Sequence, residues 1–374
     1  MNRIGFHVDS FSLRGVDQAT YQYCLLAEEN LGLEVIVLRA HKADSGWISD
    51  YLEDTFRKRF YVVDYDGSEA GLRDIISRER LEAVYVLSAG LGDERFRCVS
   101  VPVFRHSVFP TSKLDPEKDH FCVISDWLSR EYFNRKAKVV NHVIPERQTD
   151  ECFRSELGIP RDALVLGTMG GKFNFNSRLT LAGLEEVMAK RRDLWLLSLN
   201  QVICLKGENI RMMEGTGCEL KKARFINTCD FMMHGRVDGE TFGIACGEFC
   251  KAGKPIIAWT NTPQRAHLDQ FLIDRYGYKS MRDLIGLLSD LEVDTESQRL
   301  SRQMANRYCR EEIGKQFKKN FISSNVSAVS AKSRVDRIRV GCNYVARRVR
   351  VSWARKDGLG KEEISRRTGT DVSE

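Results

Sequence analysis

Two glutamates, Glu240 and Glu248, stand in the part of the chain whose residue types carry the clearest chemical pattern. The surrounding segment, 229–258, predicts a strand, a polar loop and a short helix that ends at Gly253, followed by a strand that Pro255 opens. Glu240 is expected in the loop, and Glu248 is expected nearly two turns inside the helix, roughly 10 Å away along its axis. The two carboxylates therefore bracket the N-terminus of that helix.

A helix N-terminus between two carboxylates can bind a phosphorylated ligand. The backbone amides of Phe242, Gly243 and Ile244 would be unpaired, and together with the positive end of the helix dipole they suit a diphosphate. The carboxylates could then accept hydrogen bonds from sugar hydroxyls at one end and from ribose hydroxyls at the other. The alternative is a pair of solvated glutamates beside an ordinary amphipathic helix, and the spacing alone does not decide between them.

The elements that must position this segment alternate along the chain. Short apolar runs about 20–30 residues apart, with helical patterns between them, predict right-handed βαβ crossovers and parallel sheets in both halves. The predicted strands are 4–8, 34–38, 83–87, 101–104, 121–124, 139–143, 164–168, 195–199, 231–234 and 255–259. The predicted helices are 18–31, 177–190, 242–252 and 263–272. The fold class is therefore α/β, with two doubly wound, Rossmann-like domains whose ligand is expected in a cleft at the carboxyl ends of the strands.

The chain length also favours two domains, because 374 residues exceed what one hydrophobic core usually supports. The stretch 145–161 is the best boundary. We predict an N-terminal domain over 1–145, a second domain over 146–325 and a basic tail over 326–374. The tail from 331 onward holds 12 Lys/Arg against 6 Asp/Glu and so accounts for the whole net charge of +6.

The neutral balance of the remaining residues argues against a nucleic-acid partner. The 11 cysteines form no CxxC pair, which favours reduced thiols and a cytoplasmic protein. The sequence contains no run of 18 apolar residues, so it predicts no membrane-spanning helix. The pattern Asp64-Tyr65-Asp66 has the form of a metal-binding D-x-D motif, but such matches arise by chance and this one is expected in a loop of the first half. We therefore expect no metal and no other cofactor.

The segment 229–258 resembles the E-x7-E motif of family 4 glycosyltransferases, with Glu-Thr-Phe-Gly at 240–243 followed by Ala-Gly-Lys-Pro-Ile-Ile at 252–257. More weakly, the chain over about 1–290 is similar to a viral and bacterial subgroup of these enzymes. That likeness includes Arg14-Gly15, His106, Gly170-Gly171 and Ala266-His267. The resemblance implies the GT-B fold and a retaining, metal-independent transfer of a hexosyl-type sugar from a nucleotide diphosphate sugar.

The resemblance also assigns roles to individual residues. It implies that Glu248 holds the donor ribose, that Glu240 contacts the transferred sugar and that His106 touches this sugar near the reacting centre. Arg14 and Gly15 would stand beside the phosphates, Gly171 would line the same loop as Lys172, and His234 and His267 would flank the Glu240 loop. The expected partners are a UDP- or GDP-linked sugar as donor and a glycan, glycoprotein or lipid-linked acceptor.

One departure from the family concerns the leaving group. Thr168 stands where an arginine is usual, so Lys172 is expected to stabilise the departing diphosphate, and Arg236 could compensate from a neighbouring loop. The missing arginine keeps a second function open, namely a catalytically silent protein that binds a sugar nucleotide or glycan. A related GT-B enzyme, such as an epimerase or a phosphorylase, is a third possibility.

The basic tail has a pattern of its own. Apolar residues recur at steps of three and four, which predicts a helix with one apolar stripe: Val335, Ile338, Cys342, Val345, Val349 and Trp353. This helix either packs on the body of the protein or lies on an anionic membrane surface, with the contact spanning 331–356.

Overall fold

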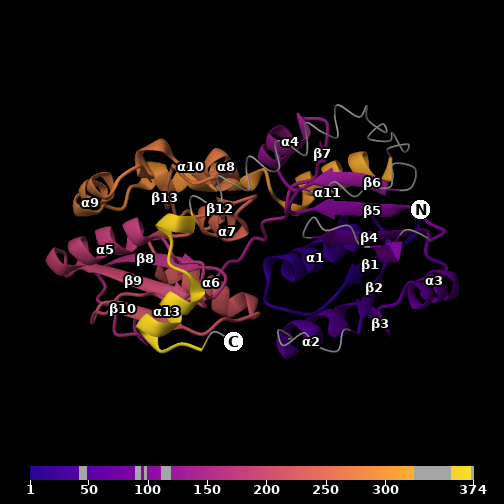
Figure 1. The fold of residues 1–374 in the computed structure, drawn as a ribbon, viewed down its shortest axis with the longest axis horizontal. Helices are drawn as coiled ribbons and strands as arrows, with labels where there is room; N and C mark the ends of the chain where they lie inside the picture. Colours follow the sequence, from indigo (N-terminus) through magenta and orange to yellow (C-terminus); the bar gives the residue numbers. More distant parts are fainter. Residues whose placement is uncertain (42–48, 89–93, 97–98, 111–118, 324–354, 372–374) are drawn as a thin grey trace. The chain divides into compact units, whose positions relative to one another are not determined.

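The computed structural model describes residues 1–41, 49–88, 94–96, 99–110, 119–323 and 355–371, which fall into two compact units (Figure 1). The first unit contains 1–145 and the later segment 308–323, and the second contains 146–307 and 355–371. The predicted helical stripe over 335–353 lies outside the described residues, so its role stays a prediction.

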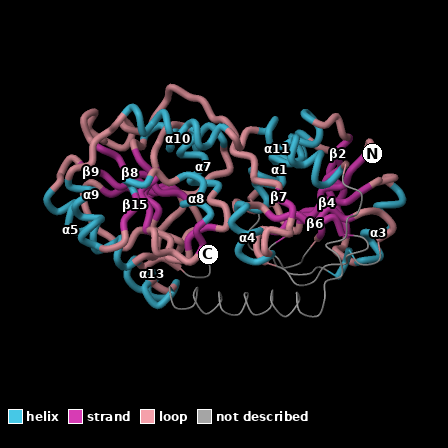
Figure 2. The backbone as a smooth tube through the Cα atoms, turned by 90° about the horizontal axis from the view of Figure 1, so that it is seen from above, coloured by secondary structure: helices cyan, strands magenta, loops and turns pink. Residues whose placement is uncertain are grey.

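The first unit is built on a parallel sheet with the strand order β3-β2-β1-β4-β5-β6-β7. Helices α1 and α11 (Arg310–Phe317) lie on one face of this sheet and α3 and α4 on the other, as expected for a doubly wound domain (Figure 2). The strands are β1 (Arg3–Val8), β2 (Glu34–Ala40), β3 (Tyr61–Tyr65), β4 (Ala83–Ser88), β5 (Val103–Ser107), β6 (Asp119–Val123) and β7 (Lys138–Val139). The helices are α1 (Gly15–Leu25, continued as a π-helix over Leu26–Asn30), α2 (Asp50–Arg59), α3 (Glu69–Arg78) and α4 (Asp126–Phe133), with one 3-10 turn at Glu94–Phe96.

The second unit repeats this architecture with the order β10-β9-β8-β11-β13-β15. In Figure 2 helices α7 and α10 cover one face of the sheet, and α5, α9 and α13 lie on the other. The strands are β8 (Leu164–Met169), β9 (Leu194–Leu199), β10 (Ile210–Met213), β11 (Phe231–His234), β13 (Ile256–Trp259) and β15 (Gly277–Tyr278), with a separate pair β12 (Gly239–Glu240) and β14 (Gln264–Arg265). The helices are α5 (Arg178–Lys190), α6 (Glu219–Thr228), α7 (Ile244–Lys251), α8 (Ala266–Phe271), α9 (Met281–Ser289), α10 (Thr295–Asn306) and α13 (Lys361–Thr368), with 3-10 turns at Asp274–Tyr276 and Arg355–Asp357.

The central strands of both sheets are continuous apolar runs, as expected for parallel sheets that helices cover on both faces. Strand β4 is buried at five of its six positions, and β9 is buried along its whole length. The segment 61–65 was not among the predicted strands, and the pattern Asp64-Tyr65-Asp66 was expected in a loop, but the structure has strand β3 here. It forms because it pairs in parallel with β2 over five residues, 61–65, at the edge of the sheet.

Two later segments do not follow the predicted domain limits. Helix α11 (Arg310–Phe317) and the π-helical turn Lys318–Ile322 belong to the first unit, because Phe317 and Phe321 pack against the rings of Tyr85 and Phe104. The second domain therefore ends before the predicted residue 325.

The end of the chain belongs to the second unit instead of forming a separate tail. Leu359 and Ile364 are 4% and 0% exposed and join the core that covers one face of the second sheet. The backbone amide of Leu359 donates a hydrogen bond to the carbonyl of Asn176, and Arg178 pairs with Glu363. Residues 355–371 are thus part of the folded unit. Among the helices that the structure describes, none is both long enough and apolar enough to cross a membrane.

Candidate functional site

The candidate site forms where neighbouring strands of the second sheet end. Strands β8 and β11 are parallel neighbours, so the loop 170–177 and the loop 235–240 leave the sheet at the same edge. The two loops are joined directly, since the amides of Asn176 and Ser177 both donate to the carbonyl of Gly235. A side chain at Gly235 would collide with the ring of Phe175, so only glycine allows this approach.

The loop that carries Glu240 is held in one conformation by its neighbours. Gly239 has a φ of +71°, and a Cβ atom there would lie 2.0 Å from the carbonyl oxygen of Gln264. This tight contact lets β12 pair with β14, with Glu240 opposite Arg265. Gly239 therefore fixes the position of the Glu240 backbone, and any other amino acid at this position would be strained.

The Glu240 carboxylate lies among positively charged and neutral nitrogen groups. Its Oε2 atom is 3.0 Å from Arg236 Nη1, its Oε1 atom is 3.6 Å from His234 Nε2, and the side chain is 27% exposed. Burial opposes its ionisation, but Arg236 and then His234 and His267 outweigh this and lower the pKa of Glu240 to about 2. Glu240 is therefore a fixed negative charge over the whole physiological pH range.

Two stacked histidines form the wall behind Glu240. The ring centroids of His234 and His267 are 4.3 Å apart, and both side chains are almost fully buried. Among the residues that the structure describes, His234 Nε2 and both ring nitrogens of His267 have no hydrogen-bond partner. Burial and the neighbouring His234 lower the pKa of His267 well below its usual value, so its ring is neutral. The structure thus brings both predicted histidines to the site.

The N-terminus of helix α7 lies between Glu240 and Glu248 in the chain, but the helix starts later than predicted, so Glu248 is its fifth residue and lies just over one turn inside it. Gly243 is the N-cap residue with a φ of +92°, the helix begins at Ile244, and no side chain caps it. The amides available to a ligand therefore start one residue later than predicted. Phe242 precedes the cap and its side chain is 2% exposed in the core.

Glu248 is buried and paired with an arginine that sequence reasoning missed. Arg147 Nη1 lies 2.6 Å from Glu248 Oε1, and the two side chains are 9% and 6% exposed. Arg147 also donates to Glu219, which in turn lies 3.4 Å from Lys222 Nζ. Glu248 therefore keeps only one carboxylate oxygen outside its ion pair. No local pattern marks Arg147, because it lies in the irregular stretch after the first unit.

The loop after β8 contains the other predicted phosphate-binding residues. Gly171 is exposed, and Lys172 Nζ lies 5.9 Å from the centroid of the Phe173 ring. Thr168, at the position where the resemblance predicts an arginine, is 1% exposed and donates to Gln201. It therefore cannot reach a ligand. Lys172 is the basic residue of the loop 170–177.

The predicted residues of the first unit differ in accessibility. Arg14 is the exposed N-cap residue of α1, and Gly15 begins that helix at the carboxyl end of β1. His106 is fully buried: its Nδ1 atom is 2.8 Å from the hydroxyl of Tyr85, and its Nε2 atom is 2.7 Å from the carbonyl of Val140. Burial lowers the pKa of His106 to about 3, so it is neutral. This corrects the expected contact with the donor sugar, since both ring nitrogens are already used inside the domain.

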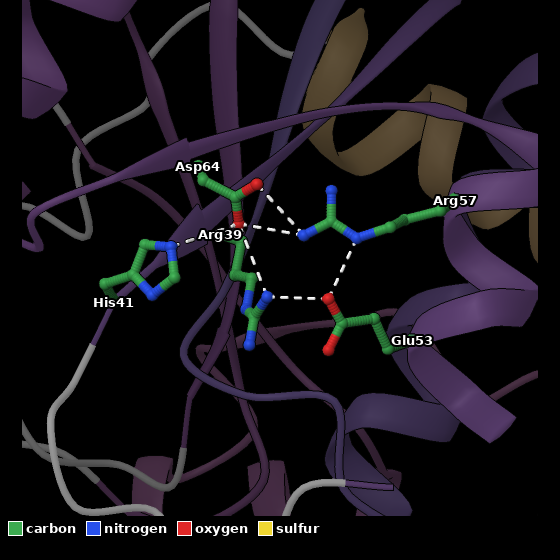
Figure 3. Close-up of polar contacts among 5 residues, drawn as sticks. All are labelled: Arg39, His41, Glu53, Arg57 and Asp64. Carbon is green, nitrogen blue, oxygen red and sulfur yellow. Dashed lines mark hydrogen bonds and ion pairs between the residues drawn. The ribbon is translucent and has the colours of Figure 1, made fainter. Parts of the chain in front are cut away.

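The aspartates of the D-x-D pattern have structural partners. Figure 3 shows Asp64 between Arg57, Arg39 and His41, with Glu53 bridging the two arginines. Asp66 accepts hydrogen bonds from the amide and hydroxyl of Ser68, at the start of α3. Across the described ranges, no group of three or more His, Cys, Asp or Glu side chains is arranged to hold a metal ion.

No family model matches the sequence, and no curated protein matches it. Several solved structures do match. A glycosyltransferase from Rickettsia africae has a TM-score of 0.65 at 11% identity, over 86% of this chain and 99% of that one. Anabaena HepE in complex with UDP and glucose gives 0.64 at 10% identity, over 87% and 100%. A putative UDP-N-acetylglucosamine 2-epimerase from Listeria monocytogenes gives 0.56 at 14% identity, over 87% and 98%. This likeness confirms the predicted GT-B fold class with two Rossmann-like, parallel-sheet domains.

Proposed function

We propose that the chain is a glycosyltransferase that moves a sugar from a nucleotide diphosphate sugar to an acceptor, with retention of anomeric configuration. The observation that carries the proposal is the arrangement of Glu240 and Glu248 on either side of the uncapped N-terminus of α7. The structural likeness to the Rickettsia glycosyltransferase and to HepE, which was solved with UDP and glucose, supports it.

Each group has a distinct task in this proposal. The diphosphate binds at the amides of α7, with Lys172 on its other side. The free oxygen of Glu248 accepts a hydrogen bond from a ribose hydroxyl. Glu240 contacts the transferred sugar, and its fixed negative charge stabilises the positive charge that develops on the sugar ring in the transition state. Lys172 stabilises the departing diphosphate.

The experiment that tests this function is a panel of UDP-, GDP- and ADP-sugars, measured by thermal shift and by donor hydrolysis. We expect a UDP-sugar to raise the melting temperature and to be hydrolysed slowly without acceptor. NMR of the products separates the alternatives, because an epimerase returns an isomeric nucleotide sugar and a silent binding protein returns the donor unchanged. The buried Thr168 is the reason to test for a silent binding protein, and the likeness to the Listeria protein is the reason to test for an epimerase.

Donor binding is expected to be independent of divalent metal. The proposed phosphate contacts are backbone amides and Lys172, so none of them requires a bridging cation. Isothermal titration with UDP should give the same dissociation constant in EDTA and in Mg²⁺. Loss of binding in EDTA would contradict the proposed phosphate site.

Lys172→Ala is expected to slow donor turnover by roughly a hundredfold, as the loss of one electrostatic contact to a developing charge typically does. Lys206→Ala is the matched control, because Lys206 is an exposed lysine of the same unit. The check is the rate of donor hydrolysis in both variants. Equal rates in Lys172→Ala and the control would remove Lys172 from the site.

A further inference from the structure

The last described segment of the chain contacts the loop that carries Glu240. Arg355 Nε lies 3.1 Å from both carboxylate oxygens of Asp238, and Arg355 Nη2 lies 2.9 Å from Asp238 Oδ2. Gly358 packs so closely that a Cβ atom there would lie 3.0 Å from the side chain of Val237. The pairing is therefore bidentate and belongs to a close contact between the chain end and the loop 235–240.

Asp238 stands between two groups of the candidate site. It is two residues from both Arg236 and Glu240, and its side chain is 11% exposed. Glu240 raises the pKa of Arg236 most, burial lowers it, and Asp238 raises it further. Both carboxylates therefore attract this guanidinium. Arg236 bonds to Glu240 in the structure, and Asp238 bonds to Arg355. Each carboxylate thus has its own arginine.

We propose that Arg355 is a positioning residue for Glu240: by pairing with Asp238, it prevents this carboxylate from drawing Arg236 away from Glu240. The inference rests on the proposed function, because it assigns the chain end a part in shaping that same site. Without Arg355, Asp238 would lose the ion pair that the structure describes for it, and Arg236, two residues away, is a cation that its carboxylate attracts. Glu240 would then lose the contact that fixes its carboxylate.

This arrangement makes a specific prediction for a pair of substitutions. Arg355→Ala should lower kcat for donor turnover by roughly tenfold, with little change in donor KM, because the altered group faces the reacting sugar. Adding Asp238→Asn should restore most of the loss, since a neutral amide does not compete for Arg236. Asp238→Asn would also relieve a purely structural cost, because it removes the unpaired charge, but a role in stability alone would leave kcat of the folded Arg355→Ala protein unchanged. Arg366→Ala, an exposed arginine of the same segment, is the control and should match the wild type.

A measurement that does not require catalytic turnover tests the same positioning role of Arg355. In protein with ¹³C-labelled glutamate, NMR titration should show the pKa of Glu240 rising in Arg355→Ala and returning in the double variant. If no donor is turned over by the wild-type chain, the proposed function fails while this titration still decides on Arg355. If the wild type is active, and Arg355→Ala leaves both kcat and the Glu240 titration unchanged or is not rescued by Asp238→Asn, the positioning role is overturned.

Discussion

Glu240→Gln is expected to lower kcat by roughly two to three orders of magnitude with a smaller effect on donor KM, which is the typical loss when one preorganised group facing developing charge is removed. Glutamine keeps the size of the side chain but removes the negative charge that Arg236 stabilises. Because the transition state carries more positive charge on the sugar than the bound donor does, the loss falls mainly on kcat.

Glu248→Gln should differ in kind and raise donor KM more than it lowers kcat. Its proposed contact is with the ribose, which is held equally in the bound donor and in the transition state. Initial rates over a range of donor concentrations separate the two parameters. Glu208→Gln, an exposed glutamate of the same unit, is the control. Full activity in both Glu240→Gln and Glu248→Gln would show that the site lies elsewhere.

The low pKa of Glu240 also links this residue to stability. A carboxyl group whose pKa is about 2 in the folded state and about 4.3 when unfolded stabilises the fold fully above pH 4.3. This contribution is lost as the pH falls through 2. The difference in unfolding free energy between wild type and Glu240→Gln should therefore be largest at neutral pH and shrink below pH 4.

Local sequence pattern was enough to predict the elements around Glu240. The segment 229–258 contains its own strand, loop, glycine turn and helix, and the predicted helices over 177–190 and 242–252 correspond to α5 and α7 with ends shifted by at most two residues. The fold class followed from the alternation of strands and helices. The elements of this segment and the fold class both follow from the pattern of residues close together in the chain. A single sequence was therefore enough to predict them.

Contacts between distant residues could not be predicted in this way. The predicted strand 101–104 placed His106 in a following loop, where the resemblance assigns it to a sugar contact, but β5 extends to Ser107 and His106 is buried inside it. The chain end has a basic, polar composition, and only the folded unit shows that Leu359 and Ile364 complete its core. Arg147 carries no motif, and its pairing with Glu248 appears only when the second unit is assembled.

Arg147→Ala is expected to be the most destabilising single change in the candidate site. Arg147 and Glu248 are both less than a tenth exposed, so removing one partner leaves a buried charge without compensation, which typically costs about 3–5 kcal/mol. Burial opposes the charge on Arg147, but Glu248 and Glu219 outweigh this and raise its pKa, so the guanidinium stays ionised. Urea unfolding at neutral pH measures the loss, and a fall in melting temperature of roughly 10 °C should accompany it.

The double variant Arg147→Met with Glu248→Gln shows whether the cost arises from the unpaired charge. Replacing both partners by neutral side chains of similar size should recover most of the stability, because neither charge of the buried pair is left, while Glu219 keeps Lys222 as its partner. Donor affinity should not recover with it, since the carboxylate proposed to hold the ribose is absent. If the double variant is as unstable as Arg147→Ala, packing of the arginine stem rather than charge explains the loss. If it binds UDP as tightly as the wild type, Glu248 does not contact the ribose.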